Sequence, residues 1–346
     1  MKRSKKTGRI SFFAYLFCPH FAGRISAAIL AAVLQSPAFF SSCTRQEDET
    51  DCRTKAQIYI QWSENPTPDA LDLFFFNQEG AMRLDAYQQI DILSAPGGVY
   101  ALSGSGERHL VAISNSGKDI YDWAGIQTYG SLGKLRFSLD EENPERPRLV
   151  GEADLSEGQS HNLFLQLRPM LCAIRIRSVA CDFSGHPYAG QPFLFNKLYL
   201  IHAGTECLPL GGDGCGPVSW MNPGRADSTA VSTLPHPEML LQEGCGPVSH
   251  KRAYPDRVLY CYANPVMEEE PGTPVTRVVL EGSVAGHTCY YPVNLPGMVP
   301  GSYYILDLTL TRMGSPDPDI PAESGTVILE TEIAPWQHRE PETITF

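Results

Sequence analysis

The chain has 346 residues, which suggests two domains of ordinary size rather than one long core. Apolar residues make up 42% and charged residues 19%, with 30 Gly and 28 Pro, so the composition disfavours a coiled coil, a helical bundle and a disordered chain. The formal net charge is −12, and because residues 1–42 hold six basic and no acidic residues, the remainder carries 21 basic against 39 acidic residues, or −18. The acidic remainder of the chain makes nucleic acid an unfavourable partner, since binding to phosphate backbones depends on clustered Lys and Arg.

The N-terminal segment has the pattern of an export signal. Basic residues are followed by the apolar stretch Ile25 to Leu34 and then by small residues just before Cys43, which is the order found in secretory signals. The sequence Phe40-Ser41-Ser42-Cys43 resembles a bacterial lipobox, so we expect a signal peptide at residues 1–42 and a lipid on Cys43. The alternatives are an ordinary secreted protein and an uncleaved membrane anchor, although the apolar run is short for a bilayer span.

An acidic stretch begins at the expected lipid site, and we expect residues 43–54 to form a tether. The acids Glu47, Asp48, Glu49 and Asp51 resemble the export tag of Bacteroidetes surface lipoproteins, and a plain solvated tether fits the same pattern. The tag implies a lipid-anchored protein exposed on the cell outer membrane.

From residue 56 onward, apolar and polar residues alternate with a period of two, which is typical of strands with one buried face. Clear examples are the segments 58–62, 135–139 and 304–310. Further strand candidates are 71–76, 109–114, 162–167, 172–178, 194–202, 257–262, 276–281, 288–295 and 325–333. Short strands separated by Gly and Pro turns, without a long run at helical spacing, predict an all-β protein built of β-sandwiches.

The apolar content falls at residues 140–160, which predicts a domain boundary near residue 158. We therefore expect an N-terminal β-sandwich domain at residues 55–158 and a C-terminal one at residues 159–346. Residues 204–255 lack clear alternation and are too long for an ordinary connection, so we expect a long irregular insertion there.

Apart from Cys18 and Cys43, the chain has eight cysteines, an even number that suits an oxidising compartment. Sequence cannot choose their pairing, and buried free thiols are the alternative for several of them. The segment Gly214-Cys-Gly-Pro-Val-Ser219 recurs at residues 244–249, which makes a disulfide between Cys215 and Cys245 a candidate. Two similar turns that arose by chance explain the repeat as well.

No pattern of catalysis or metal binding stands out. The chain has no H-E-x-x-H motif, no G-x-S-x-G elbow and no C-x-x-C pair, and its histidines are scattered. Asp317, Asp319 and Glu323 offer few oxygens for calcium, so a solvated turn is favoured there. We expect no catalytic residues, no metal and no cofactor, and hence no enzyme.

Five C-terminal segments follow one another in a recognisable order: 260–265 (YCYANP), 276–282 (TRVVLEG), 286–293 (GHTCYYPV), 303–319 and 333–336 (IAPW). The upstream segments 70–80 (ALDLFFFNQEG) and 165–176 (LQLRPMLCAIRI) belong to the same series. This order resembles that of the fimbrillins, the FimA/Mfa-type subunits of Bacteroidetes type V pili. The resemblance covers most of residues 55–346, is dense after 257 and is weak from 180 to 256. It implies two transthyretin-like β-sandwich domains with Greek-key-type antiparallel sheets.

The resemblance also implies assembly by donor-strand exchange, in which a subunit donates a C-terminal segment to a groove of its neighbour. An open sheet edge has unpaired N–H and C=O groups that an added strand can bind. The candidate donor residues are Val327, Leu329, Thr331, Ile333, Ile344 and Phe346, and the candidate first-strand residues of the acceptor groove are Ile58, Ile60 and Trp62. The alternative is that both segments are ordinary terminal strands of their own domain.

In polymerising members of this family, proteolysis after a basic residue removes the first strand. Here the next basic residue after the segment 55–62 is Arg83, beyond a second predicted strand, and a cut at Arg53 would release the lipid but leave the first strand. This departure favours an anchor or accessory subunit over a shaft subunit.

The expected function is that of a lipid-anchored pilus subunit in cell adhesion. Its expected partners are other pilus subunits, the outer membrane and a host or bacterial surface ligand. The alternative is a monomeric glycan-binding surface lipoprotein that uses Trp123 and Trp220 as stacking platforms.

Overall fold

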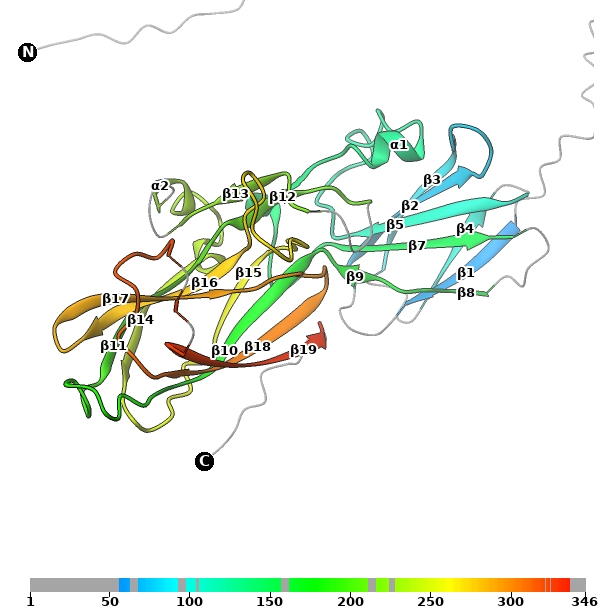
Figure 1. Cartoon of the computed structure of the whole chain (residues 1–346). Helices are drawn as coiled ribbons and strands as arrows, with labels where there is room; N and C mark the ends of the chain where they lie inside the picture. The colour runs from blue at the N-terminus through cyan, green and yellow to red at the C-terminus, as the bar shows by residue number, and fades with distance from the viewer. Residues whose placement is uncertain are drawn as a thin grey trace, which may run out of the picture. The chain divides into compact units, whose positions relative to one another are not determined.

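The computed structural model describes residues 56–336, except 63–67, 93–97, 104–105, 157–161, 211–215, 224–227, 321 and 324 (Figure 1). The expected signal peptide and tether, with Cys43, lie outside the described residues, as do Ile344 and Phe346. Within the described part nearly all regular structure is β-strand, so the all-β fold class is confirmed. No helix in that part is long and apolar enough to cross a membrane.

Strands from the first half of the described chain form two sheets. One has the order β3-β2-β5-β7-β9 and the other the order β4-β1-β8. Their bounds are β1 (Ala56–Trp62), β2 (Ala70–Asn77), β3 (Leu84–Asp91), β4 (Val99–Ser103), β5 (Arg108–Ser114), β7 (Leu149–Leu155), β8 (Asn162–Leu165) and β9 (Arg168–Pro169).

Strand β2 is buried on both faces, which accounts for its continuous apolar sequence. Leu71, Leu73 and Phe75 pack in a core with β1, β4 and β8. Phe74 and Phe76 point to the opposite face and join a second core that includes Trp123. The five-stranded sheet is therefore covered by the smaller sheet on one side and by the segment around Trp123 on the other.

The second half also forms two sheets. One has the order β13-β12-β15-β10-β18-β19, with β6 also paired to β12, and the other the order β14-β11-β16-β17. Their bounds are β6 (Phe137–Ser138), β10 (Leu171–Cys181), β11 (Phe193–Ile201), β12 (Ala203–Cys207), β13 (Ser219–Met221), β14 (Leu241–Val248), β15 (Arg257–Tyr262), β16 (Arg277–Val284), β17 (His287–Asn294), β18 (Ser302–Leu310) and β19 (Val327–Pro335). The described helices are short: α1 (Tyr129–Leu132), η2 (Leu139–Glu141), α2 (Ser228–Val231) and η4 (Pro237–Met239).

The strand pairing adds detail that the local pattern does not contain. The alternation at 135–139 yields only the two residues of β6, because the chain turns into η2 at Leu139. The segment 204–255 holds β13, β14 and most of β12, whose Gly and Pro residues obscure the alternation. Strands β8 and β9 pair with β1 and β7 of the first half although they follow residue 158. The division into two domains stays a prediction.

A buried polar network connects the segment after β6 to β15. The Tyr262 hydroxyl donates to Glu142 Oε1 at 2.9 Å, and the Arg148 backbone N–H donates to Glu142 Oε2 at 3.2 Å. The Arg148 guanidinium lies 4.6 Å from the centre of the Phe137 ring. Burial raises the pKa of the Glu142 carboxyl, against the opposing effect of Arg148. These contacts hold the loop that follows η2 next to β15.

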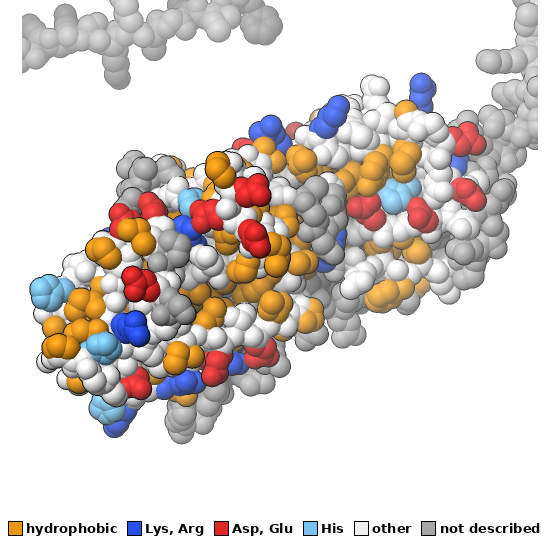
Figure 2. Space-filling model, viewed as in Figure 1, with side chains coloured by type: hydrophobic (Ala, Val, Ile, Leu, Met, Phe, Trp, Pro, Cys, Tyr) orange, Lys and Arg blue, Asp and Glu red, His pale blue; other side chains and the backbone are white. Residues whose placement is uncertain are grey.

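Charges on the described surface are mixed. On the face shown in Figure 2, Lys and Arg side chains are interspersed with Asp and Glu, and the coloured residues form no continuous basic area.

Candidate functional site: the first and last strands

Strand β1 occupies the centre of its sheet. It pairs antiparallel with β4 from Ala56↔Ser103 to Ile60↔Val99, and parallel with β8 from Tyr59↔Asn162 to Trp62↔Leu165 (Figure 1). Its two edges are thus both used in hydrogen bonding. Removing β1 would leave unpaired backbone groups on β4 and on β8, with an open slot between them.

One of the alternating residues of β1, Ile60, lies in the first core. Ile60 is fully buried among residues of β2, β5 and β8. Ile58 lies opposite Ala101 and Trp62 opposite Leu165, and both of these partners are buried. The side chains of Ile58 and Trp62 are outside the described set. By register, positions 58, 60 and 62 share one face of the strand.

Strand β19 lies at the edge of its sheet. It pairs with β18 over nine residue pairs, from Ser302↔Pro335 to Leu310↔Val327. Figure 1 shows it in red beside β18, and within the described residues no strand pairs with its outer edge. The last described strand therefore presents the unpaired backbone groups that an edge offers to another chain.

The alternating row of β19 faces the core side of the sheet, where Val327 is half-buried against the second core and the next three members are exposed. In register, Leu329, Thr331 and Ile333 lie opposite Leu308, Leu306 and Tyr304, which are buried in the second core. Residues that lie directly opposite share a face of the sheet, yet Leu329 is 38% and Ile333 63% exposed. We call the residues Val327, Leu329, Thr331 and Ile333 the β19 row. Ile328, on the other face, is 54% exposed.

An ion pair and a backbone hydrogen bond hold β19 and the residue after it in place. Arg177 on β10 donates to Asp307 of β18 from Nε at 2.9 Å and to Glu332 of β19 from Nη1 at 2.9 Å. The bond from Arg177 holds the pKa of the Asp307 carboxyl below its usual range, and Ser178 also donates to it. The backbone N–H of Trp336 donates to the Gly301 carbonyl at 2.8 Å, just after the strand ends.

The sequence that joins β1 to β2 has no site for a protease that cuts after a basic residue. Residues 63–69 (SENPTPD) contain no Lys or Arg. The next basic residue, Arg83, follows β2 and forms a backbone bridge with Thr128. A cut after Arg83 would detach β2 together with β1, and β2 supplies five fully buried apolar side chains between Leu71 and Phe76. Cleavage after a basic residue therefore cannot separate β1 alone.

Several other predicted features are placed by the structure. Cys172, Cys181, Cys261 and Cys289 are buried free thiols, and burial raises the pKa of the Cys261 thiol to about 12. Cys245 lies in β14, whereas Cys215 is outside the described residues, so a disulfide between them stays a prediction. Among the described residues no group of His, Cys, Asp or Glu is arranged to hold a metal ion.

His109 belongs to an ion-pair cluster on β5 and β7 that the sequence did not reveal. Its Nδ1 lies 2.7 Å from Asp154 Oδ1 and its Nε2 lies 2.9 Å from Glu152 Oε2. Glu152 also accepts a hydrogen bond from the Tyr129 hydroxyl at 2.9 Å. The bond to Glu152 raises the pKa of His109. All the ring nitrogens are satisfied, so the cluster joins the two strands rather than serving as a base.

In the glycan-binding alternative, the proposed stacking platform at Trp123 is wrong. Trp123 is buried and packs edge-on against Phe74, with ring centres 5.0 Å apart. Trp220 lies in β13 and is half-buried, with its indole N–H shielded from solvent. The alternation of the sequence does not distinguish these two tryptophans from exposed ones.

No family model and no curated protein matches the sequence. Solved structures do match it. A candidate cell adhesion protein of Parabacteroides distasonis superposes with a TM-score of 0.59 at 11% identity, covering 82% of this chain and 98% of that one. One from Bacteroides eggerthii gives 0.57 at 17% identity, covering 82% and 96%. A fimbrilin of Porphyromonas gingivalis gives 0.58 at 12% identity, covering 82% and 97%. The chain therefore has the β-sandwich fold of these three proteins, which confirms the fold class and the structural neighbours predicted from the sequence.

Proposed function

We propose that the protein is a non-enzymatic, lipid-anchored pilus subunit of the outer membrane that takes part in cell adhesion and has other pilus subunits as partners. The observation that carries the proposal is the β19 row, which faces the core side of its sheet and leaves Leu329, Thr331 and Ile333 exposed at an open edge. The shared fold with a fimbrilin and with candidate cell adhesion proteins supports it.

In this proposal β19 and the following residues act as the donor strand. An added strand gains main-chain hydrogen bonds at an open edge, and its alternate side chains fill pockets of the acceptor. The β19 row supplies apolar side chains at alternate positions. Because Leu329 and Ile333 are exposed in the monomer, little core is lost when they move to a partner, and only Val327 leaves a contact with the second core. The tail residues Ile344 and Phe346 belong to a second, separate alternating piece at residues 343–346 (TITF).

We further propose that the subunit sits at the anchor end of the pilus or is an accessory subunit, and that it keeps its lipid on Cys43. The support is the absence of Lys and Arg from residues 63–69, together with the central position of β1. A subunit that retains β1 has no open slot between β4 and β8. It can donate a strand to a neighbour but cannot accept one there.

Charged substitutions on the two faces of β19 test strand donation. We expect Leu329→Asp and Ile333→Asp to abolish incorporation into SDS-resistant filaments, because a carboxylate cannot enter an apolar pocket without losing its hydration. Ile328→Asp, on the other exposed face, is the matched control and should assemble normally. The monomers should melt alike, since all three side chains are exposed. Normal assembly of the Leu329 and Ile333 variants would refute the donor role.

Metabolic labelling tests the anchor. Cells fed a palmitate analogue should label the wild-type protein and not Cys43→Ala, because only the thiol of residue 43 accepts the lipid. Mass spectrometry of the labelled protein should also find β1 still attached to the chain. Label retained in Cys43→Ala would overturn the lipid assignment, and a mature chain that begins after Arg83 would overturn the anchor role.

A further inference from the structure

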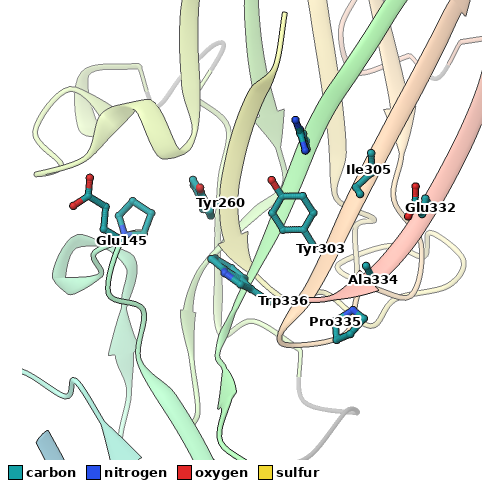
Figure 3. Close-up of a pocket in the computed structure, with 10 residues that line it drawn as sticks. Glu145, Tyr260, Tyr303, Ile305, Glu332, Ala334, Pro335 and Trp336 are labelled. Atoms are coloured by element: carbon teal, nitrogen blue, oxygen red, sulfur yellow. The ribbon is translucent and has the colours of Figure 1, made fainter. Parts of the chain in front are cut away.

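A cavity of about 430 Å³ lies on the outer side of the sheet that contains β19. Its walls come from four strands and from the loop after η2, and include Tyr260, Tyr303, Trp336, Arg175, Glu332 and Glu145. In Figure 3 the three aromatic rings lie together at the centre, with Glu145 on one side and Glu332 on the other. The volume is in the range of small-molecule sites.

The aromatic side chains form a connected group. The rings of Tyr260 and Trp336 have centres 5.5 Å apart with an angle of 31°, and those of Tyr303 and Trp336 are 6.4 Å apart and nearly perpendicular. Trp336 is almost completely buried and supports the two tyrosines from below. Both tyrosines are half-buried and line the cavity. The cavity therefore offers the faces and hydroxyls of two tyrosines that are held by a fixed indole.

The polar groups of the cavity divide into paired and unpaired ones. Arg175 Nε lies 2.5 Å from Asp256 Oδ1, and Glu332 is bound to Arg177, so both charges are neutralised. In the described part of the structure, the hydroxyls of Tyr260 and Tyr303 and the carboxylate of Glu145 have no such partner. Burial raises the pKa of Tyr260 to about 12 and also raises that of Tyr303, so both hydroxyls stay protonated at neutral pH.

We propose that this cavity binds a neutral saccharide. The C–H face of a sugar ring packs on the face of a tyrosine, while its hydroxyls donate to the Glu145 carboxylate and exchange hydrogen bonds with the two phenols. An anionic ligand would meet the unpaired Glu145 carboxylate, and Arg175 offers no free charge to attract it because Asp256 binds the guanidinium. A polyhydroxylated neutral ligand matches the unpaired hydroxyls of Tyr260 and Tyr303 and the unpaired carboxylate of Glu145.

The site depends on the position of β19. Glu332, Ala334 and Pro335 belong to that strand, and Trp336 follows it directly. If β19 leaves β18, the cavity loses this wall, so saccharide binding requires the paired state of the strand. Binding by the isolated subunit depends on neither lipid attachment nor pilus assembly, and its failure would therefore leave the proposed function untouched.

A glycan array of neutral oligosaccharides, followed by calorimetry with the strongest one, tests the site on the purified protein. We expect binding of at least one neutral glycan. Tyr303→Phe should weaken it by about 2- to 10-fold, through loss of one neutral hydrogen bond, and Glu145→Gln by about 10-fold or more, through loss of a charged acceptor. Both variants keep the shape of the side chain, and their melting curves should match the wild type.

Matched controls are Tyr121→Phe and Glu268→Gln, which change exposed residues outside the cavity and should leave the affinity unchanged. Three outcomes would overturn the proposal: no neutral glycan bound at millimolar concentration, a bound glycan whose affinity does not respond to Tyr303→Phe and Glu145→Gln, or a preference for acidic glycans.

Discussion

Replacing Ile60 by alanine tests whether β1 fills the core of the free subunit. Ile60 is fully buried between the two sheets of the first half, among Leu73, Phe75 and Leu165. Truncating a buried isoleucine to alanine removes its transfer free energy and leaves a cavity, at a cost of about 2–5 kcal/mol. Because β1 is held by partners on both edges, the surroundings cannot close over the cavity, and we expect a loss of about 3 kcal/mol.

The assay is unfolding in guanidinium chloride and by heat, followed by tryptophan fluorescence. For a cooperative unit of 150–250 residues, each kcal/mol lowers the Tm by about 2–4 °C, so the expected decrease is about 6–12 °C. Ile328→Ala makes the same chemical change at a side chain that is 54% exposed. We expect that control to lose less than about 0.5 kcal/mol.

A change of less than about 1 kcal/mol in Ile60→Ala would refute the reasoning. It would mean that β1 is displaced in the isolated protein and that the slot between β4 and β8 is already open. Such a subunit could accept a strand without proteolysis, and the proposed anchor position would lose its main support.

Three further substitutions test contacts on β18, β5 and β16. Asp307→Asn should lower the free energy of unfolding by about 1.5–3 kcal/mol at pH 7, because Arg177 and Ser178 lose a charged acceptor. Since the pKa of Asp307 is lowered, the difference from wild type should shrink as the pH falls through and below 3.8 in denaturant titrations, and a constant difference would contradict the assignment. His109→Gln should lower the free energy of unfolding most below pH 6.5 and least at pH 9. The reason is that the pKa of His109 is raised in the folded state, so its contribution to stability is lost as the pH rises. A loss of stability that grows with pH would rule out the ion pairs. Gly282→Ala should destabilise by about 1–3 kcal/mol, because a methyl group there overlaps the Phe193 ring and the Leu194 carbonyl, whereas Gly125→Ala has open space and should be neutral in thermal melts.

The alternation of the sequence was sufficient to find most strands and their buried faces. Tyr304, Leu306, Leu308 and Leu310 lie at alternate positions, with Asp307 and Thr309 between the last three, and the structure buries all four in one core. Period-two alternation follows from the geometry of a single strand, so it needs no knowledge of the neighbours. The strand at 71–76 was also found, but its burial on both faces depends on the sheet and the loop that cover it.

The alternation of the sequence predicts only part of the candidate site. The β19 row has the same alternating pattern as β18, and the sequence predicts correctly that its members share a face. Whether that face is covered depends on how far the opposing sheet extends, which no local pattern records. Trp123 lies outside the strands, and only the tertiary structure shows that it packs against Phe74 and is buried.

The sequence by itself therefore determined the fold class, the shared face of the β19 row and the absence of a basic residue between β1 and β2, because these are properties of contiguous residues. Only the tertiary structure decided that β1 is a central strand, that β19 is an uncovered edge, and that Glu145, Tyr260 and Tyr303 line one cavity with Trp336. The physical reason is that burial and strand order arise from contacts between residues 40 to 190 positions apart, such as Tyr59 with Tyr100 and Glu145 with the strand that ends at Pro335.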